Sequence, residues 1–126
     1  MNKMKYRLLG LFFLLSTASI AQDTKALFTD AMKQLQAGKL EEGIKLLDQV
    51  ITQKPDEYPA LYNRAIAKSM LRRYEEAMPD FEQAIKAKPD AKKAFIGRAI
   101  ARKKLTNYDG ALADLNKALR LEPNLG

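Results

Sequence analysis

Two arginine–aspartate pairs have the most specific spacing in this sequence of 126 residues. Arg64 and Asp80 are 16 residues apart, and so are Arg98 and Asp114. An arginine and a carboxylate can form a bidentate ion pair, and beside a nucleophile or a metal they could take part in catalysis. The sequence contains no Cys and no His, so it offers neither a Cys/His metal site nor a nucleophile–base pair of those types. We therefore predict structural ion pairs at both places.

No other group of residues has the spacing of an active site. Glu75 and Glu76 are adjacent on a predicted helix, so the two carboxylates cannot face one substrate together. The sequence has no phosphate-binding glycine-rich loop and no set of metal ligands at motif spacing. We expect a protein without catalytic activity, without a cofactor and without a metal.

The first 21 residues have the order of regions found in a secretory signal peptide. Three basic residues precede the apolar run LLGLFFLL, and the small residues Ser19 and Ala21 fit cleavage before Gln22. The uncharged stretch is 15 residues long, shorter than the roughly 20 residues that a membrane-spanning helix needs. We expect an exported protein, periplasmic or secreted, that attaches to a membrane only if this leader stays uncleaved.

Charge is spread unevenly over the sequence. Without the basic residues of the leader, the formal net charge falls from +7 to +4, which argues against nucleic acid as a partner. Most of the remaining excess lies on one predicted helix near the C-terminus, which carries six basic residues: Lys92, Lys93, Arg98, Arg102, Lys103 and Lys104. Such a helix could bind an acidic peptide, an anionic lipid or an anionic polysaccharide, or it could be a solvated face.

Three prolines mark a repeat with a period of 34 residues: Pro55, Pro89 and Pro123. The repeat units are residues 24–57, 58–91 and 92–125, and the last two agree at 11 of 34 positions. Each unit has two blocks of apolar residues at helical spacing with a short polar break, which predicts a helix hairpin. In two of the breaks, Gly38 and Asn107 suit the left-handed backbone that ends a helix.

The residues at fixed positions of the unit resemble the tetratricopeptide repeat family. The matching sets are Leu27/Leu61/Phe95, Ala31/Ala65/Ala99, Leu40/Tyr74/Tyr108, Gly43/Ala77/Ala111, Leu47/Phe81/Leu115, Val50/Ala84/Ala118 and the three prolines. The resemblance implies an all-α solenoid of three helix hairpins in a right-handed superhelix with a concave inner face. The hairpins must lean on one another, because one hairpin alone cannot bury its apolar stripe. Tyr74 and Tyr108 are therefore expected in the core.

The resemblance also implies which residues face the concave side and bind a partner. These are an apolar line, an asparagine and a basic end: Phe28, Met32, Tyr62, Ile66, Ile96 and Ile100, then Asn63, then Lys93, Lys103 and Lys104. An apolar strip of this length marks a contact surface, although about half of these side chains should also pack against neighbouring helices. We expect a scaffold that binds a protein or peptide and no nucleic acid.

Some members of this family grip the C-terminal carboxylate of heat-shock chaperones with a clamp of Lys, Asn, Asn, Lys and Arg. This sequence matches the clamp at Asn63 and Lys93 alone, and Phe28, Met32 and Gly97 stand at the other positions. The sequence therefore predicts a different mode of binding.

A second function remains open for the last helix of the array. Four leucines would leave an apolar stripe on the open end: Leu112, Leu115, Leu119 and Leu121. This stripe predicts either a docking surface for another subunit, through which copies could stack end to end, or the continuation of a longer array. Mutation separates the two functions, since Leu119→Glu would disrupt self-assembly and leave a partner in the groove.

Overall fold

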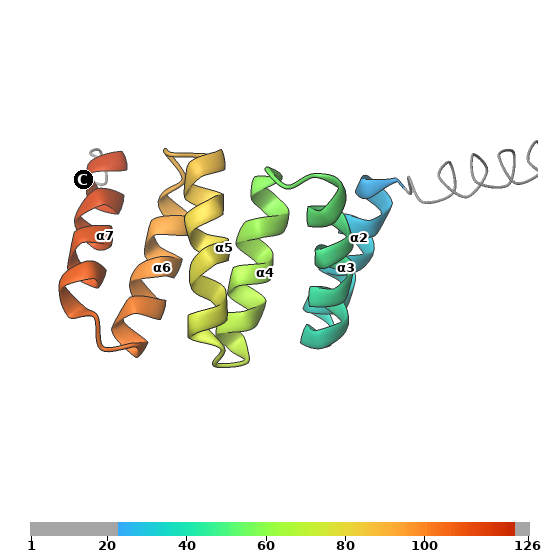
Figure 1. The fold of residues 1–126 in the computed structure, drawn as a ribbon, viewed down its shortest axis with the longest axis horizontal. Helices are drawn as coiled ribbons and strands as arrows, with labels where there is room; N and C mark the ends of the chain where they lie inside the picture. The colour runs from blue at the N-terminus through green and yellow to red at the C-terminus, as the bar shows by residue number, and fades with distance from the viewer. Residues whose placement is uncertain (1–22, 123–126) are drawn as a thin grey trace, which may run out of the picture.

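In the computed structural model, which describes residues 23–122, the chain folds into three helix hairpins in a row (Figure 1). The helices are α2 (Thr24–Gln36), α3 (Leu40–Gln53), α4 (Tyr58–Met70), α5 (Tyr74–Ala87), α6 (Lys92–Lys104) and α7 (Tyr108–Leu121). No strand occurs in this described part, so the protein is the all-α solenoid of helix hairpins that the resemblance implies. The expected signal peptide, residues 1–21, and the third proline, Pro123, lie outside the described residues.

The turn inside each hairpin has one residue with a left-handed backbone. These residues are Gly38, Arg72 and Thr106, with φ of 78°, 61° and 65°. The expectation of a left-handed Asn107 was wrong by one residue, since its φ is −87°. Asn107 instead begins α7 as its N-cap, where its side-chain oxygen accepts a hydrogen bond from the Gly110 backbone N–H at 3.0 Å. Asparagine suits both roles, so its type alone does not distinguish them.

Side-chain caps occur at the first and the last described helix, α2 and α7. Asp23 caps α2 by accepting a hydrogen bond from the Lys25 backbone N–H at 2.9 Å, and Asn107 caps α7. The residues that precede the four helices between them, α3 to α6, make no such hydrogen bond. Because capping contributes about 1 kcal/mol per helix, α3 to α6 depend more on packing than α2 and α7 do.

Small residues let the helices approach closely inside and between hairpins. Ala31, Ala65 and Ala99 occupy one repeat position and are almost fully buried. Between hairpins, α6 meets α5 at Gly97, where a Cβ atom would lie 2.5 Å from Cε1 of the buried Phe81 ring. A larger residue at Gly97 would therefore force the two hairpins apart.

The first helices of the second and third hairpins approach each other. Beyond the contacts between consecutive helices, α4 contacts α6 directly, whereas neither α2 with α4 nor the second helices of the hairpins make a contact of this extent within residues 23–122. At the second and third hairpins, the side of the first helices is therefore the inner side of the array. The residues expected to bind a partner lie on the first helices α2, α4 and α6, which we call the inner helices.

The last hairpin differs from the others in its outer helix. Tyr74 on α5 is half-buried, but Tyr108, at the same repeat position on α7, is 64% exposed. The expectation that Tyr108 lies in the core was therefore wrong. Tyr74 packs against a core cluster that includes Ala101 on α6 of the next hairpin. No described element follows α7. A packing position in a repeat is buried only when the next repeat is present.

Candidate binding surface

The first predicted ion pair joins the two helices of the second hairpin. Arg64 on α4 donates two hydrogen bonds to Asp80 on α5, from Nε at 2.9 Å and from Nη2 at 2.6 Å. Lys68, one turn further along α4, adds a third from Nζ at 2.9 Å. The Asp80 side chain is only 5% exposed, so two cations surround a carboxylate that has little contact with water. Its oxygens are therefore occupied by structural partners.

The third hairpin repeats this arrangement. Arg98 donates to Asp114 from Nε at 3.0 Å and from Nη2 at 2.8 Å, and Nη1 of Arg102 donates at 2.9 Å. The second cation of each cluster was missed in the sequence. A signal for it is present, because Lys68 and Arg102 share a repeat position and are both basic. A buried carboxylate needs this much compensation, since an unpaired charge in the interior is costly.

Arg64 also connects the first hairpin to the second. Its Nη1 atom donates to Asp48 on α3 at 2.8 Å, so one guanidinium bridges carboxylates of two hairpins. Burial lowers the pKa of Arg64, but the hydrogen bonds to Asp80 and Asp48 outweigh this effect and raise the pKa. Arg64 therefore stays charged wherever the protein is folded. A more exposed pair, Arg73 with Glu41, joins the same two hairpins.

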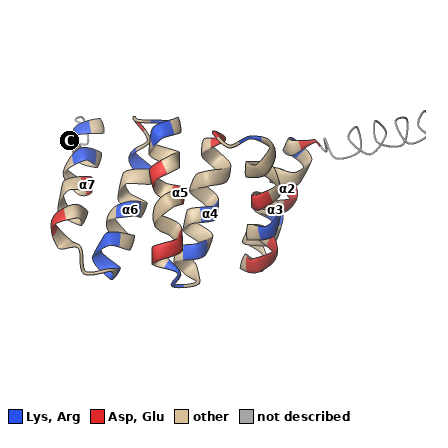
Figure 2. Ribbon diagram, viewed as in Figure 1, with Lys and Arg blue, Asp and Glu red and all other residues tan. Residues whose placement is uncertain are grey.

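Three of the six basic side chains on α6 are engaged in ion pairs inside the hairpin. Arg98 and Arg102 bind Asp114, and Lys92 binds Glu122. The other three are exposed and form no ion pair within residues 23–122: Lys93, Lys103 and Lys104. Figure 2 shows the basic residues at the C-terminal end of α6 and acidic residues at the start of α3. The positive charge available to a partner is therefore smaller than the sequence suggests, and it lies at the three predicted positions.

Most of the predicted apolar line is half-buried, as expected for side chains that also pack against neighbours. Tyr62 and Ile66 on α4 pack against the buried core around Ala65 and Phe81. Tyr62 also stacks on Tyr58, with ring centroids 5.8 Å apart, and burial raises the pKa of both tyrosines. Phe28, Met32, Ile96 and Asn63 are half-buried too. Ile100 on α6 differs, because it is 52% exposed.

Phe28 lines a pocket of about 350 Å³ where α2 meets the start of α4. Pro59 and Val50 add apolar surface, and Lys25 and Lys54 add positive charge. The remaining lining residues are Thr24, Thr29 and Glu57. Sequence reasoning placed Phe28 on the binding surface but missed Val50 and Lys54, which come from the second helix and its end. The pocket therefore combines an apolar wall with two lysines and one glutamate.

A model of the tetratricopeptide repeat matches residues 29–92 and 70–125. The chain belongs to the tetratricopeptide repeat family. This confirms the family that the repeat positions indicate, and the match spans all three hairpins. The comparison with curated proteins gave no match.

Solved tetratricopeptide repeat domains have the same fold. The first such domain of Spaghetti (RPAP3), bound to the HSP90 peptide SRMEEVD, has 28% identity and a TM-score of 0.78, over 82% of each chain. The second domain, bound to the same peptide, has 30% identity and a TM-score of 0.77, over 80% of this chain and 94% of that one. The Arabidopsis OM64 domain, at 24% identity and a TM-score of 0.77, covers 80% of this chain and 84% of its own and supports the fold alone.

The positions of the carboxylate clamp are only partly available in this tetratricopeptide repeat protein. The Asn63 side chain donates a hydrogen bond to the Pro59 backbone oxygen of its own helix at 2.7 Å. Phe28 and Met32 are half-buried apolar side chains, and Gly97 is buried against Phe81. Lys93 is exposed and forms no ion pair within residues 23–122. Of the two residues that match the clamp, Lys93 alone therefore has its polar group unengaged in this range.

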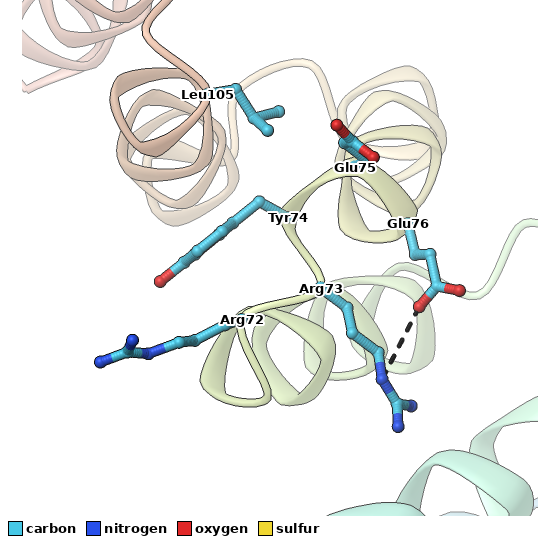
Figure 3. A pocket seen from close by; sticks show the side chains of 6 residues that line it. All are labelled: Arg72, Arg73, Tyr74, Glu75, Glu76 and Leu105. Atoms are coloured by element: carbon cyan, nitrogen blue, oxygen red, sulfur yellow. Dashed lines mark ion pairs between the residues drawn. The ribbon is translucent and has the colours of Figure 1, made fainter.

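A larger pocket, of about 430 Å³, lies away from all of these residues, at the turn of the second hairpin (Figure 3). Its lining is Arg72, Arg73, Tyr74, Glu75, Glu76 and Leu105. Figure 3 shows Arg72 and Tyr74 extending to one side, away from the ion pair of Arg73 with Glu76 at 3.9 Å.

Within residues 23–122 there is no cluster of three or more potential metal-binding side chains. No helix in that range is long and apolar enough to cross a membrane.

Proposed function

We propose that this protein is a non-enzymatic scaffold that binds an acidic peptide along the inner helices α2, α4 and α6. One observation carries this proposal: Lys93, Lys103 and Lys104 are exposed beside the exposed Ile100 on α6, while the other cations of that helix are engaged in ion pairs. An apolar residue between free cations favours a ligand that combines carboxylates with bulky apolar side chains.

Two features support a peptide as the ligand class. The two domains of Spaghetti, at 28% and 30% identity, bind a peptide of seven residues with three acidic side chains. The pocket at Phe28 has the size and the rim charge to take an apolar side chain of such a peptide, with Lys25 and Lys54 near its carboxylates. An extended peptide could therefore contact α2 through this pocket and α6 through its lysines.

Selection from a displayed library of random peptides tests the proposal. The bait is residues 22–126, compared with a variant that carries Ile100→Glu, Lys103→Glu and Lys104→Glu. We expect the unmodified bait to enrich peptides with acidic and bulky apolar residues, and the variant to lose this enrichment. These three side chains are exposed, so the variant should keep its fold, as circular dichroism can verify. Tyr62 and Ile66 are less suitable because they also pack in the core.

A matched control changes lysines on the outer helices. Lys45 on α3 and Lys86 on α5 are also exposed, and Lys45→Glu with Lys86→Glu makes a comparable change of net charge. Enrichment should survive in this control. Equal loss in the two charge-reversed baits would show that binding follows net charge and not the inner surface, and would contradict the proposal.

We also propose that the protein is exported, on the basis of the leader pattern in residues 1–21. Expression of the full chain in a Gram-negative host, followed by fractionation and N-terminal sequencing, tests this. We expect a periplasmic product that begins at Gln22. A product that stays in the cytoplasm and retains residues 1–21 would contradict export.

A further inference from the structure

The outer helix of the last hairpin exposes a row of side chains that is covered in the other two hairpins. On α7 the row is Tyr108, Leu112, Leu115 and Leu119, with exposed fractions of 64%, 59%, 42% and 64%. The same repeat positions on α3 and α5 are buried or half-buried: Leu40, Ile44, Leu47 and Ile51, then Tyr74, Met78, Phe81 and Ile85. We name the four residues of α7 the α7 seam. A contiguous apolar row with this exposure is typical of a contact surface.

The first helix of another copy does not fit the α7 seam in the way that α4 and α6 fit the preceding hairpins. Those helices meet their neighbours with alanines that are almost fully buried: Ala60 and Ala67 on α4, Ala94 and Ala101 on α6. At the position of Ala67 and Ala101, α2 carries the exposed Lys33. Stacking would move the charged end of this lysine out of water, which is costly. This disfavours end-to-end stacking of copies.

The α7 seam is complementary to itself when two copies of α7 run antiparallel. Its spacings are four, three and four residues, which is the narrow seam of two-helix packing. These spacings read the same in both directions along the helix. A two-fold axis near Ala113 and Asp114 therefore places Leu112 opposite Leu115 of the second copy, and Tyr108 opposite Leu119 of the second copy.

Charge along the edge of the seam fits the same arrangement. Asp109 lies at the start of α7 and Arg120 near its end, both are exposed, and neither forms an ion pair within residues 23–122. With the antiparallel axis, Asp109 lies about two residues, or roughly 3 Å along the helix, from Arg120 of the second copy. An arginine side chain spans that offset, and the symmetry gives two such pairs per dimer. Parallel helices would instead bring like charges together.

We propose that this protein forms a two-fold dimer through antiparallel contact of the α7 seams. The two solenoids extend away from each other, because α7 lies at one end of the array (Figure 1). The inner surfaces of both copies stay open, so one dimer presents two peptide-binding faces. Because the seam is short, the dimer is weak and depends on protein concentration.

Sedimentation velocity of residues 22–126, which contain all described helices, tests the dimer. Over a roughly hundredfold range of concentration we expect a reversible monomer–dimer equilibrium. Leu119→Glu should raise the dissociation constant at least about tenfold, since it places charge in the seam of both copies. Met70→Glu is the matched control, because Met70 has the same exposed fraction of 64% but lies on α4. This control should leave the equilibrium unchanged.

Exchange of the two charges tests the antiparallel orientation. Asp109→Arg and Arg120→Asp should each weaken the dimer by roughly threefold or more, and the double variant should restore it. A chain that stays monomeric over the whole range would overturn the proposal, as would oligomers that grow beyond the dimer. A double variant that binds no better than the single variants would overturn the orientation. Peptide selection is independent of these results and should be unaffected by Leu119→Glu.

Discussion

Leu47 on α3 and Leu115 on α7 are the same residue type at the same repeat position, yet their surroundings differ completely. Leu47 is fully buried between the first and second hairpins, whereas Leu115 is 42% exposed at the end of the array. Phe81, the equivalent residue on α5, is also fully buried. The difference comes from the next hairpin and not from the residue. We call the contact between two consecutive hairpins a junction: the first lies between the first and second hairpins, the second between the second and third. In a repeat protein, the stability contributed by one position therefore depends on whether a junction covers it.

The largest effect is expected from truncation of these leucines. Leu47→Ala should lower the free energy of unfolding by about 3 to 5 kcal/mol, because it leaves a cavity in a closed junction. Leu115→Ala should cost about 1 kcal/mol, since part of that side chain already contacts water. Urea unfolding at low protein concentration, where the proposed dimer is dissociated, measures both. Equal losses would show that the α7 seam is covered even in the monomer.

A second effect concerns the two ion pairs of Arg64, one with Asp80 inside the second hairpin and one with Asp48 on the first hairpin. Arg64→Ala should cost about 3 kcal/mol, because buried Asp80 loses two hydrogen bonds and Asp48 loses its link to the second hairpin. Lys68→Ala removes one hydrogen bond to Asp80 and should cost clearly less. Thermal unfolding followed by circular dichroism compares the two variants. Similar melting temperatures would mean that the two contacts of Arg64, with Asp80 and with Asp48, contribute little beyond what Lys68 contributes.

Gly97→Ala tests how closely the second junction is packed. Alanine normally stabilises a helix interior relative to glycine by about 1 kcal/mol. Here the added Cβ would meet the buried ring of Phe81 at 2.5 Å, so we expect a net loss of about 1 to 2 kcal/mol. Gly43→Ala should also lose stability, because its Cβ would overlap both Cγ and Cδ2 of the half-buried Leu35 side chain. A gain at Gly97 would contradict the close approach.

The smallest effect is expected at the hairpin turns. Thr106→Gly should raise the free energy of unfolding by about 1 kcal/mol, because a β-branched residue is strained at a φ of 65°. Arg72→Gly, at the same position of the preceding turn, should give a smaller gain, because arginine is not β-branched. Whether a hairpin is covered should not matter at either position, since backbone strain is local. A loss at either position, in the same thermal assay, would argue against strain.

The fold could be predicted from the sequence because one period governs it. Prolines, small residues and apolar residues recur together every 34 residues, and local patterns of this kind specify helices and their pairing. Arg64 with Asp80 was predictable for a similar reason, since both residues recur with the same spacing in the third unit as Arg98 and Asp114. In a repeat protein, one unit of the sequence can be compared with the next, and residues that recur together in two units indicate a contact.

The rest depends on contacts that spacing does not encode. Tyr108 has the pattern of a core residue, but its burial requires a neighbour that the described chain lacks. The charge on α6 could be counted, yet the engagement of Lys92 by Glu122 depends on side-chain reach across a hairpin. The pocket at Phe28 combines residues of α2, of the end of α3 and of the start of α4, so Val50 and Lys54 could be identified only once these helices were in place.

The caps at Asp23 and Asn107 have a consequence for how the array comes apart. The first turns of α2 and α7 are each stabilised by a side-chain hydrogen bond, whereas α3 to α6 are stabilised mainly by packing against the helices on either side. Local unfolding of α2 and α7 is therefore opposed at their N-terminal turns. A mutation that separates the central hairpins has a different effect, because α3 to α6 have no side-chain cap to keep them helical once they lose their neighbours.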